Sequence, residues 1–315
     1  MTCHNCKIEA KKFGKDRKGN QRYRCNKCRK TFQAYRERLM GNMYLTEEKA
    51  LLVLNLLLEG NSIRSIERIT GIEKKTITSV LLLAGERCED LMNEKIKGVA
   101  VKDVEADEIW GFCKMKKMTR LSRGITDPFV GDAYTFVGME RNTKLVLAWH
   151  LGQRDAANSE AFTEKLDRAT SGHFQLTTDG FFGYAEAVSY SLGTRVDYAQ
   201  LIKVYGKDRD PEGEQKYSPP EVVDIITKTI IGNPEPYRVC TSIVERGNLS
   251  MRTSIRRLTR LTNAFSKKWT NLRAALALYF AYYNFCRIHS SIRCTPAMES
   301  GITQHVWTLR DLLAT

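Results

Sequence analysis

Hydrophobic positions between residues 45 and 91 recur at the three- and four-residue spacing of amphipathic helices. The stretch LTEEKALLVLNLLLEGNS predicts a first helix with Thr46 as its N-cap, and Ser62 caps a short second helix that stops at Gly71. A third helix is predicted over 72–88. Helix, short glycine turn and helix are typical of a helix-turn-helix motif, although a three-helix bundle without a ligand shows the same pattern.

From about residue 98 the helical pattern gives way to apolar stretches typical of strands. One strand is predicted over 99–113 and two over 133–155, with a turn near Arg141-Asn142. Helix and strand then alternate to residue 206. This order predicts an α/β sheet of mixed direction that resembles the ribonuclease H fold, and it also fits other α/β sheets.

The first 28 residues contain two close pairs of cysteines, Cys3 with Cys6 and Cys25 with Cys28, separated by 18 residues. Two such pairs can place four sulfurs around one tetrahedral zinc ion. A unit of about 40 residues cannot fold on its own core, so the metal would supply the folding energy. The alternative is a redox-active pair, but the double spacing favours a zinc ribbon over residues 1–40.

Details of the same segment suit a ribbon. Gly14 and Gly19, with basic residues between them, predict a hairpin that joins the two cysteine pairs. Tyr23 and Phe32 could supply its small apolar support.

Positive charge is concentrated at two places in the 315-residue chain, whose net charge is +14. Residues 1–40 hold 13 Lys and Arg against 3 acids, and residues 246–293 hold 10 Lys and Arg and no acid. Basic segments of this size favour a polyanion such as nucleic acid as the partner, because each neutralised phosphate releases counterions. The alternative is a solvated face.

Two sets of residues are candidates for contact with double-stranded DNA. In a helix-turn-helix the start of the last helix meets the base edges. Here those residues are Lys74, Lys75, Thr76, Thr78 and Ser79. The second set recurs every four residues, which predicts one helix face that either follows a phosphate backbone or is merely solvated: Arg252, Arg256 and Arg260.

Three carboxylates lie on or at the ends of three different predicted elements, from which they could converge on one metal site. Asp107 lies on the first predicted strand, Asp179 ends the fourth, and Glu245 begins a helix. Carboxylates from three elements can hold two Mg²⁺ ions about 4 Å apart for phosphodiester chemistry. Three further acids compete with Asp107 for this role: Asp103, Glu105 and Glu108. Asp107 is preferred because it precedes the apolar Ile-Trp end of the strand.

Several short motifs together resemble the DDE transposases of bacterial and archaeal insertion sequences, and most closely the insertion-sequence-one type family. The motifs are Asp107-Glu108-x-Trp110, Thr178-Asp179-Gly180, Val244-Glu245-Arg246-x-Asn248-Leu249-x-Met251-Arg252, and a C-terminal block from Tyr283-Asn284 through Arg287 and His289 to Thr295-Pro296. The resemblance covers nearly the whole chain. One departure is the long interval before Glu245, where residues 206–238 contain five of the seven prolines and suggest an insertion.

The resemblance implies a zinc ribbon over 1–40, a helix-turn-helix domain over 41–97 and a ribonuclease-H-like catalytic domain over 98–315 that ends in a long helical segment. It implies Mg²⁺, which Mn²⁺ can replace, at Asp107, Asp179 and Glu245. Water would free a 3′-OH at the element's end, and that 3′-OH would attack target DNA, within a dimer or larger assembly. The alternative is a DNA-binding regulator whose third domain is catalytically inactive.

The expected location is the cytoplasm of a prokaryote, in association with the nucleoid. No apolar run reaches the 18 residues needed to span a bilayer, and the start of the chain lacks the apolar core of a signal peptide. A membrane partner is therefore not expected.

Overall fold

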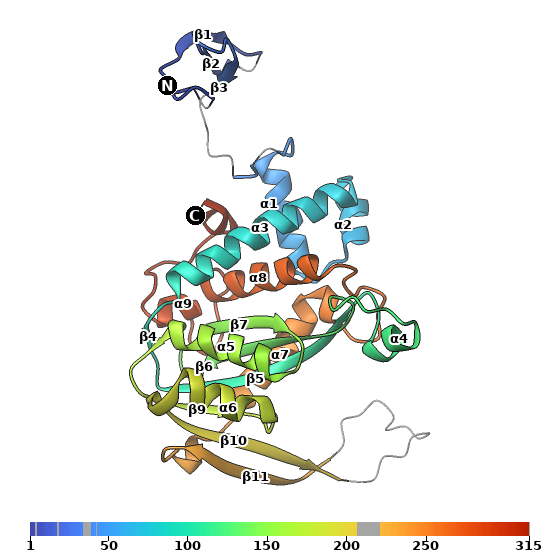
Figure 1. The fold of residues 1–315 in the computed structure, drawn as a ribbon, viewed down its shortest axis with the longest axis vertical. Coiled ribbons are helices and arrows are strands. Elements are labelled where there is room, and N and C mark those ends of the chain that lie inside the picture. Colours follow the sequence, from blue (N-terminus) through green and yellow to red (C-terminus); the bar gives the residue numbers. More distant parts are fainter. Residues whose placement is uncertain (4, 18, 34–38, 42, 207–220, 315) are drawn as a thin grey trace. The chain divides into compact units, whose positions relative to one another are not determined.

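The chain forms two compact units, Met1–Tyr44 and Leu45–Thr315. The structure is a computed structural model that describes residues 1–315 except 4, 18, 34–38, 42, 207–220 and 315. Figure 1 shows both units as ribbons. The helices predicted between 45 and 91 belong to the second unit, together with the α/β sheet.

The first unit is a three-stranded antiparallel sheet in the order β1-β2-β3. Its strands are β1 (Lys11–Lys15), β2 (Gln21–Arg24) and β3 (Thr31–Gln33). Gly14 and Gly19, at the hairpin between β1 and β2, both have the positive φ that glycine adopts most easily. Tyr23 lies opposite Phe32 across β2 and β3, with ring centroids 6.2 Å apart. The predicted hairpin and its aromatic support are confirmed.

Three helices open the second unit: α1 (Glu47–Leu58), α2 (Ile63–Thr70) and α3 (Lys74–Lys95). The Thr46 side chain accepts a hydrogen bond from the Lys49 N–H, and the Ser62 side chain accepts one from the Ser65 N–H, so both predicted N-caps are confirmed. Gly71 ends α2 in the left-handed conformation with φ +69°, as expected for a glycine at a helix C-terminus.

Helix α3 packs along α8 (Trp269–Phe285), which joins the N-terminal helices to the C-terminal segment (Figure 1). At their crossing, a Cβ on Gly85 would lie 2.5 Å from the Cα of Ala274. Only glycine allows the two backbones to approach this closely. Asn284 extends the connection to the sheet, because its side chain bonds both the N–H and the C=O of Val146.

The central sheet of the second unit has six strands in the order β11-β10-β9-β5-β6-β7. In chain order these strands are β5 (Asp103–Cys113), β6 (Gly131–Glu140), β7 (Val146–Gly152), β9 (Phe174–Thr178), β10 (Val196–Tyr205) and β11 (Val222–Ile231). Strand β9 is parallel to both β5 and β10, and the other neighbouring pairs are antiparallel. The sheet therefore has the mixed direction that the sequence predicted.

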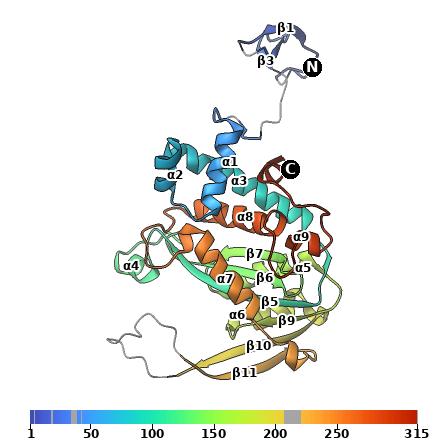
Figure 2. The same ribbon diagram turned by 180° about the vertical axis from the view of Figure 1, so that it is seen from behind.

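Helices cover both faces of this sheet. Helices α5 (Ala156–Ala169) and α6 (Phe182–Ser191) lie on one face, and α7 (Ser242–Ser254) crosses the other, as a comparison of Figures 1 and 2 shows. The remaining short elements are β4 (Val99–Ala100), β8 (Thr170–Ser171), α4 (Lys117–Ser122), α9 (Pro296–Glu299) and α10 (Leu309–Ala314). With ten α-helices among the described residues and a mixed sheet, the fold belongs to the α/β class. None of those helices is long and apolar enough to cross a membrane.

Two local expectations were wrong. No strand was predicted after residue 206, where an insertion was expected to lead to the helix of Glu245, yet the segment 206–238 contains β11, which pairs antiparallel with β10. Three of the prolines that suggested the insertion fall in 207–220, outside the described residues. Arg252, Arg256 and Arg260 do not share a helix face, because α7 ends at Ser254 and a short 3-10 turn (Arg256–Leu258) follows. Four-residue spacing alone did not show where the helix stops.

The close approach at Gly85 predicts a stability change. Alanine is a better helix former than glycine by about 1 kcal/mol. Gly85→Ala should nevertheless lower the free energy of unfolding by about 1–3 kcal/mol, because the new methyl group would overlap Ala274. Urea denaturation measures the change. Asn93→Ala, at an exposed position of the same helix, is the control and should be neutral or stabilising; equal behaviour of the two variants would contradict the close crossing.

Candidate functional site

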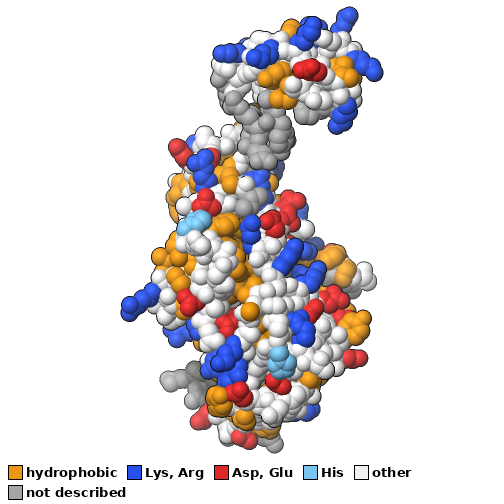
Figure 3. Space-filling model, turned by 90° about the vertical axis from the view of Figure 1, so that its left-hand side faces the viewer, with side chains coloured by type: hydrophobic (Ala, Val, Ile, Leu, Met, Phe, Trp, Pro, Cys, Tyr) orange, Lys and Arg blue, Asp and Glu red, His pale blue; other side chains and the backbone are white. Residues whose placement is uncertain are grey.

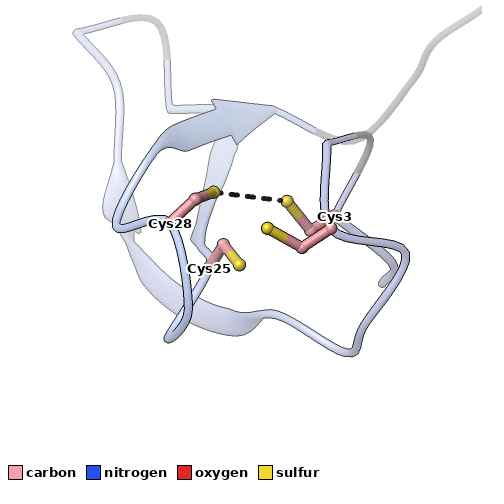
Figure 4. Close-up of side chains that lie close together, drawn as sticks. Cys3, Cys25 and Cys28 are labelled. Carbon is pink, nitrogen blue, oxygen red and sulfur yellow. Dashed lines mark hydrogen bonds between the residues drawn. The ribbon is translucent and has the colours of Figure 1, made fainter.

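Four free thiols gather in the first unit. The sulfurs of Cys3, Cys6, Cys25 and Cys28 all lie within 4.8 Å of one another, and Cys3 Sγ is 3.7 Å from Cys28 Sγ (Figure 4). A tetrahedron with Zn–S bonds of about 2.3 Å places its sulfurs about 3.8 Å apart. The four cysteines therefore fit one zinc ion, as the sequence predicted, and form no disulfide with one another.

The backbone around each cysteine pair repeats the same turn. The Lys7 N–H donates to the Cys3 C=O and the Arg29 N–H donates to the Cys25 C=O, each at 2.9 Å. Lys7 and Arg29, which follow the second cysteine of each pair, have φ values of 55° and 54°. Two equivalent turns from opposite ends of the unit thus aim the sulfurs at one point.

Two aspartates meet at the centre of the large sheet. Strands β5 and β9 are parallel neighbours with Ala106 opposite Thr178, so Asp107 and Asp179 follow at the same level. Together with Glu108 they offer ligand oxygens that all lie within 4.8 Å of one another. This group could bind a divalent metal, since Mg²⁺ prefers carboxylate oxygens. Glu108 was only a rival to Asp107 in the sequence.

Gly180 is required by its surroundings rather than by its backbone conformation. Its φ is not positive, so the turn after Asp179 does not require glycine for conformational reasons. A Cβ at this position would lie 2.9 Å from Cγ1 of Ile202 on β10. Glycine is needed here because the chain leaving Asp179 passes close to the neighbouring strand.

Burial and mutual repulsion hold the acids close to protonation. Burial raises the pKa of Asp107 to about 7, and the negative charge of Asp179 adds to the shift. The pKa of Glu108 also rises to about 7, again through burial and Asp179. Its buried Oε1 lacks a hydrogen bond of good geometry, although the Tyr184 hydroxyl lies beside the carboxylate. A metal ion beside Glu108 Oε1 and the Asp107 carboxylate would supply the positive charge that favours their ionised forms. The carboxylate oxygens of Asp107, Glu108 and Asp179 therefore fit a metal ion.

Arg154 links two of these acids. Its guanidinium donates to Glu108 Oε2 and to Asp179 Oδ2, both at 3.2 Å, and lies 4.2 Å from the centre of the Phe181 ring. Arg154 lies two residues after the end of β7 in the sequence, and its side chain is 38% exposed. It therefore supplies positive charge at the rim of the acid group, within reach of solvent.

Glu245 stands apart from the group that Asp107, Glu108 and Asp179 form. It lies in the first turn of α7, where its carboxylate accepts from the Thr241 hydroxyl at 2.6 Å and pairs with Lys203 of β10. Its charge still contributes to the raised pKa of Asp107. One turn further on, Asn248 donates to Asp107 Oδ2 at 2.7 Å, so α7 reaches the first aspartate through an amide.

The rivals Asp103 and Glu105 have structural partners. Asp103 pairs with Arg238. Glu105, 2% exposed, accepts from the backbone N–H groups of Ile243 and Val244 at the start of α7. These hydrogen bonds and ion pairs give both acids a role in anchoring the segment before α7, whereas Asp107 lies beside Asp179.

The residues predicted to contact DNA lie in two environments. Lys74 and Lys75 are exposed at the start of α3, while the hydroxyls of Thr78 and Ser79 bond backbone carbonyls one turn earlier and Thr76 is half-buried. Arg256 and Arg260 are exposed. Arg252 instead donates to the carbonyls of Trp110 and Leu258, and burial lowers its pKa to about 10.

Basic side chains dominate the surface of the first unit that faces the viewer in Figure 3, with few acids among them. In the second unit, a groove of about 740 Å³ borders Asp179. Its walls include Lys117, Arg120 and Arg154, together with Phe182, which is 76% exposed. Asp132, Asp155 and Asp179 also line this groove, so cations and acids face one another across it.

Several residues at the site were missed from the sequence: Glu108 as a group member, and Arg154, Lys203, Asn248 and Phe182. Glu108 follows Asp107 directly, so its proximity was available. The others come from separate elements, and nothing local marks them as neighbours of the two aspartates. No protein-family model matches the chain, and no curated protein matches it significantly.

The cysteine group predicts one zinc ion per chain. Cys25→Ser should remove that ion and unfold residues 1–44, while thermal unfolding of the second unit stays unchanged, because the small sheet has little core of its own. Elemental analysis and thermal denaturation measure both effects. Cys240→Ser, which alters a thiol outside the group, should keep the zinc. A parent protein without zinc would contradict the assignment.

The raised carboxyl pKa values predict a pH effect. A carboxyl with a raised pKa binds its proton more tightly in the folded chain, so its contribution to stability falls as pH rises towards about 7. Asp107→Asn should therefore gain stability over the parent at about pH 8.5 and keep only part of that gain at about pH 5.5, because the gain declines from the raised pKa of about 7 down to the ordinary pKa near 4. Urea denaturation without added Mg²⁺ measures this.

The control for this experiment is Asp224→Asn, at an exposed position of β11, which should behave like the parent at both pH values. Added Mg²⁺ should stabilise the parent more at the higher pH, because the ion competes with protons for the same oxygens. A pH-independent effect of Asp107→Asn would show that its carboxyl is not strained by burial and repulsion.

Proposed function

We propose that the protein is a DDE transposase that binds the ends of a DNA element and cuts and joins DNA in a metal-dependent reaction. The observation that supports this most is the juxtaposition of Asp107 and Asp179 at adjacent parallel strands, with Glu245 in the first turn of α7. The order β7-β6-β5-β9-β10 is similar to that of the ribonuclease H fold. The motif of Asp107 lies on β5, that of Asp179 at the end of β9 and that of Glu245 on α7, while the C-terminal block begins at the end of α8.

Asp107 and Asp179 would hold the metal ions, joined by Glu108, by Glu245, or by both. When bound, Mg²⁺ supplies Lewis acidity for attack on a phosphodiester and for departure of the leaving oxygen. Asn248 orients the Asp107 carboxylate through its hydrogen bond. Arg154 and Lys203 limit the repulsion among the acids and place positive charge where a phosphate would approach.

DNA binding would be divided between the two units. The basic zinc ribbon offers charge for the phosphate backbone, and the exposed Lys74 and Lys75 lie where a recognition helix meets base edges. The groove beside Asp179 would receive the strand that reacts. Two element ends must be held together for joining, which favours a dimer or larger assembly. A protein of this function would act in the cytoplasm, at the nucleoid.

One observation favours a second function, a DNA-binding regulator with an inactive third domain. Glu245 is paired with Lys203 and Thr241 rather than gathered with the two aspartates. If this arrangement persisted with metal present, the site would lack its third predicted ligand. A cleavage assay separates the two functions.

The transposase proposal predicts that Asp107→Asn, Asp179→Asn and Glu245→Gln each lower the rate of Mg²⁺-dependent cleavage and strand transfer by roughly a thousandfold or more. Each substitution is close to isosteric, so folding and DNA binding should be retained. The assay uses DNA that contains the element's ends, with Mg²⁺ or Mn²⁺, and gel-shift binding in parallel. Glu186→Gln, at an exposed position of α6, is the control and should cleave normally.

Glu108→Gln decides between the two possible third ligands. If it abolishes cleavage and Glu245→Gln does not, the third ligand is the neighbour of Asp107 and the metal-dependent mechanism stands. A parent protein that binds end-containing DNA and never cleaves it would support the regulator. Cleavage by all the named variants at the parent rate would exclude the metal-dependent mechanism.

A further inference from the structure

A second pocket, of about 500 Å³, lies on the other side of α7. The helix turns Glu245 and Asn248 towards the acids, while Ile243, Arg246 and Ser250 line this pocket. Its remaining walls come from β6, from the turn that follows β6 and from the segment after α8. Met139 lies on β6, Lys144 in the turn, and Arg287 and His289 in the segment after α8, while Tyr283 near the end of α8 completes the wall.

The pocket is strongly basic. Lys144, Arg246 and Arg287 line it, no acid does, and none of the three forms an ion pair with any acid in the described part of the chain. Three unneutralised cations around one cavity repel each other, so the arrangement is stabilised by an anion that enters it.

His289 is held so that it can donate into this cavity. The Ser291 N–H lies 3.3 Å from His289 Nδ1 and donates to it, so the neutral ring carries its proton on Nε2. The Ser291 hydroxyl lies 2.9 Å from the same nitrogen, and Tyr283 packs edge-on against the ring. Burial lowers the pKa of His289, and the charges of Lys144, Arg287 and Arg246 lower it further. A bound anion would reverse the effect of those charges.

We infer that this pocket binds a phosphate group of DNA. Arg246 and Arg287 would donate to the phosphate oxygens, and Lys144 and the His289 ring would complete the set of donors. Ser250 and Ser290 add hydroxyl donors, while Ile243 and Ile288 offer apolar surface for the adjoining sugar. This inference rests on the proposed function for the presence of DNA. A phosphate held by Arg246 would also fix DNA to the helix that carries Glu245.

The test is DNA binding by the double variant Arg246→Ala, Arg287→Ala, measured by fluorescence anisotropy without Mg²⁺ over a range of salt concentrations. We expect weaker binding and a salt slope lower by roughly one unit for each phosphate that the variant no longer neutralises. The matched control is Lys97→Ala with Arg168→Ala, because these exposed cations line another pocket that also contains Glu89. That control should keep both the affinity and the slope.

Arg287→Lys, which keeps the charge, guards against loss of folding and should retain most of the slope. Nuclear magnetic resonance of His289 in the parent supplies an independent measurement, because DNA should raise the pKa of this histidine. Duplexes with and without a 5′-phosphate distinguish a terminal phosphate from an internal one. A gain from the 5′-phosphate that vanishes in the double variant indicates the terminal group, and loss of affinity for both duplexes indicates an internal phosphodiester.

An unchanged affinity and slope in the folded double variant would overturn the inference. The inference would also be overturned if a poly-glutamate peptide bound the parent more tightly than the double variant while DNA bound both equally. The partner would then be an acidic protein segment. Cleavage with Mg²⁺ is measured separately. If DNA binding depends on the pocket but the parent protein never cleaves DNA, the catalytic proposal is wrong and this inference stands. If the parent cleaves DNA normally and the double variant keeps the parent's salt slope, this inference is wrong and the catalytic proposal stands.

Discussion

The buried carboxylate of Glu105 fixes the geometry on which both candidate sites of the second unit depend. It extends from the third residue of β5 to accept hydrogen bonds from the first free N–H groups of α7, at 2.7 Å from Ile243 and 3.1 Å from Val244. Negative charge at a helix N-terminus is stabilised by the helix dipole. Burial raises the pKa of Glu105 while the two N–H groups oppose the shift. A single side chain therefore sets where α7 begins on the sheet.

Because α7 begins at that point, its two sides serve different chemistry. One side of α7 places Asn248 in hydrogen-bond contact with Asp107 and Glu245 close enough for its charge to act on Asp107. The other side presents Arg246 to the basic pocket. Charge balance follows the same division. The acids are accompanied by Arg154 and Lys203, whereas the cations of the pocket have no acid beside them. The basic pocket, whose cations lack acidic partners, is where an anion is expected to bind. The acid group is partly neutralised by Arg154 and Lys203 and is where metal ions are expected.

The sequence predicted what depends on local order. The caps Thr46 and Ser62, the cysteine pairs, the mixed sheet and the positions of Asp107 on the first strand and Asp179 at the end of a later one followed from spacing and periodicity, whereas the pairing of those two strands did not. It missed what depends on distant partners. The pairing of Glu245 with Lys203 joins residues far apart in the chain, and β11 lay in a stretch whose prolines obscured its alternation. Glu108 was passed over because Asp107 was preferred as the acid that precedes the apolar Ile-Trp end of the strand.

Strand β11 gives the sheet an open edge with its own liability. It is exposed along most of its length, no other described strand pairs with its outer side, and Val223 and Ile225 are more than half exposed. An apolar edge of this kind is a template for strands of other molecules. Asp224 and Lys228 are its charged residues, and a charge on an edge strand opposes pairing with an apolar strand of another molecule. Loss of both charges would leave an uncharged, largely apolar edge that invites pairing with another chain.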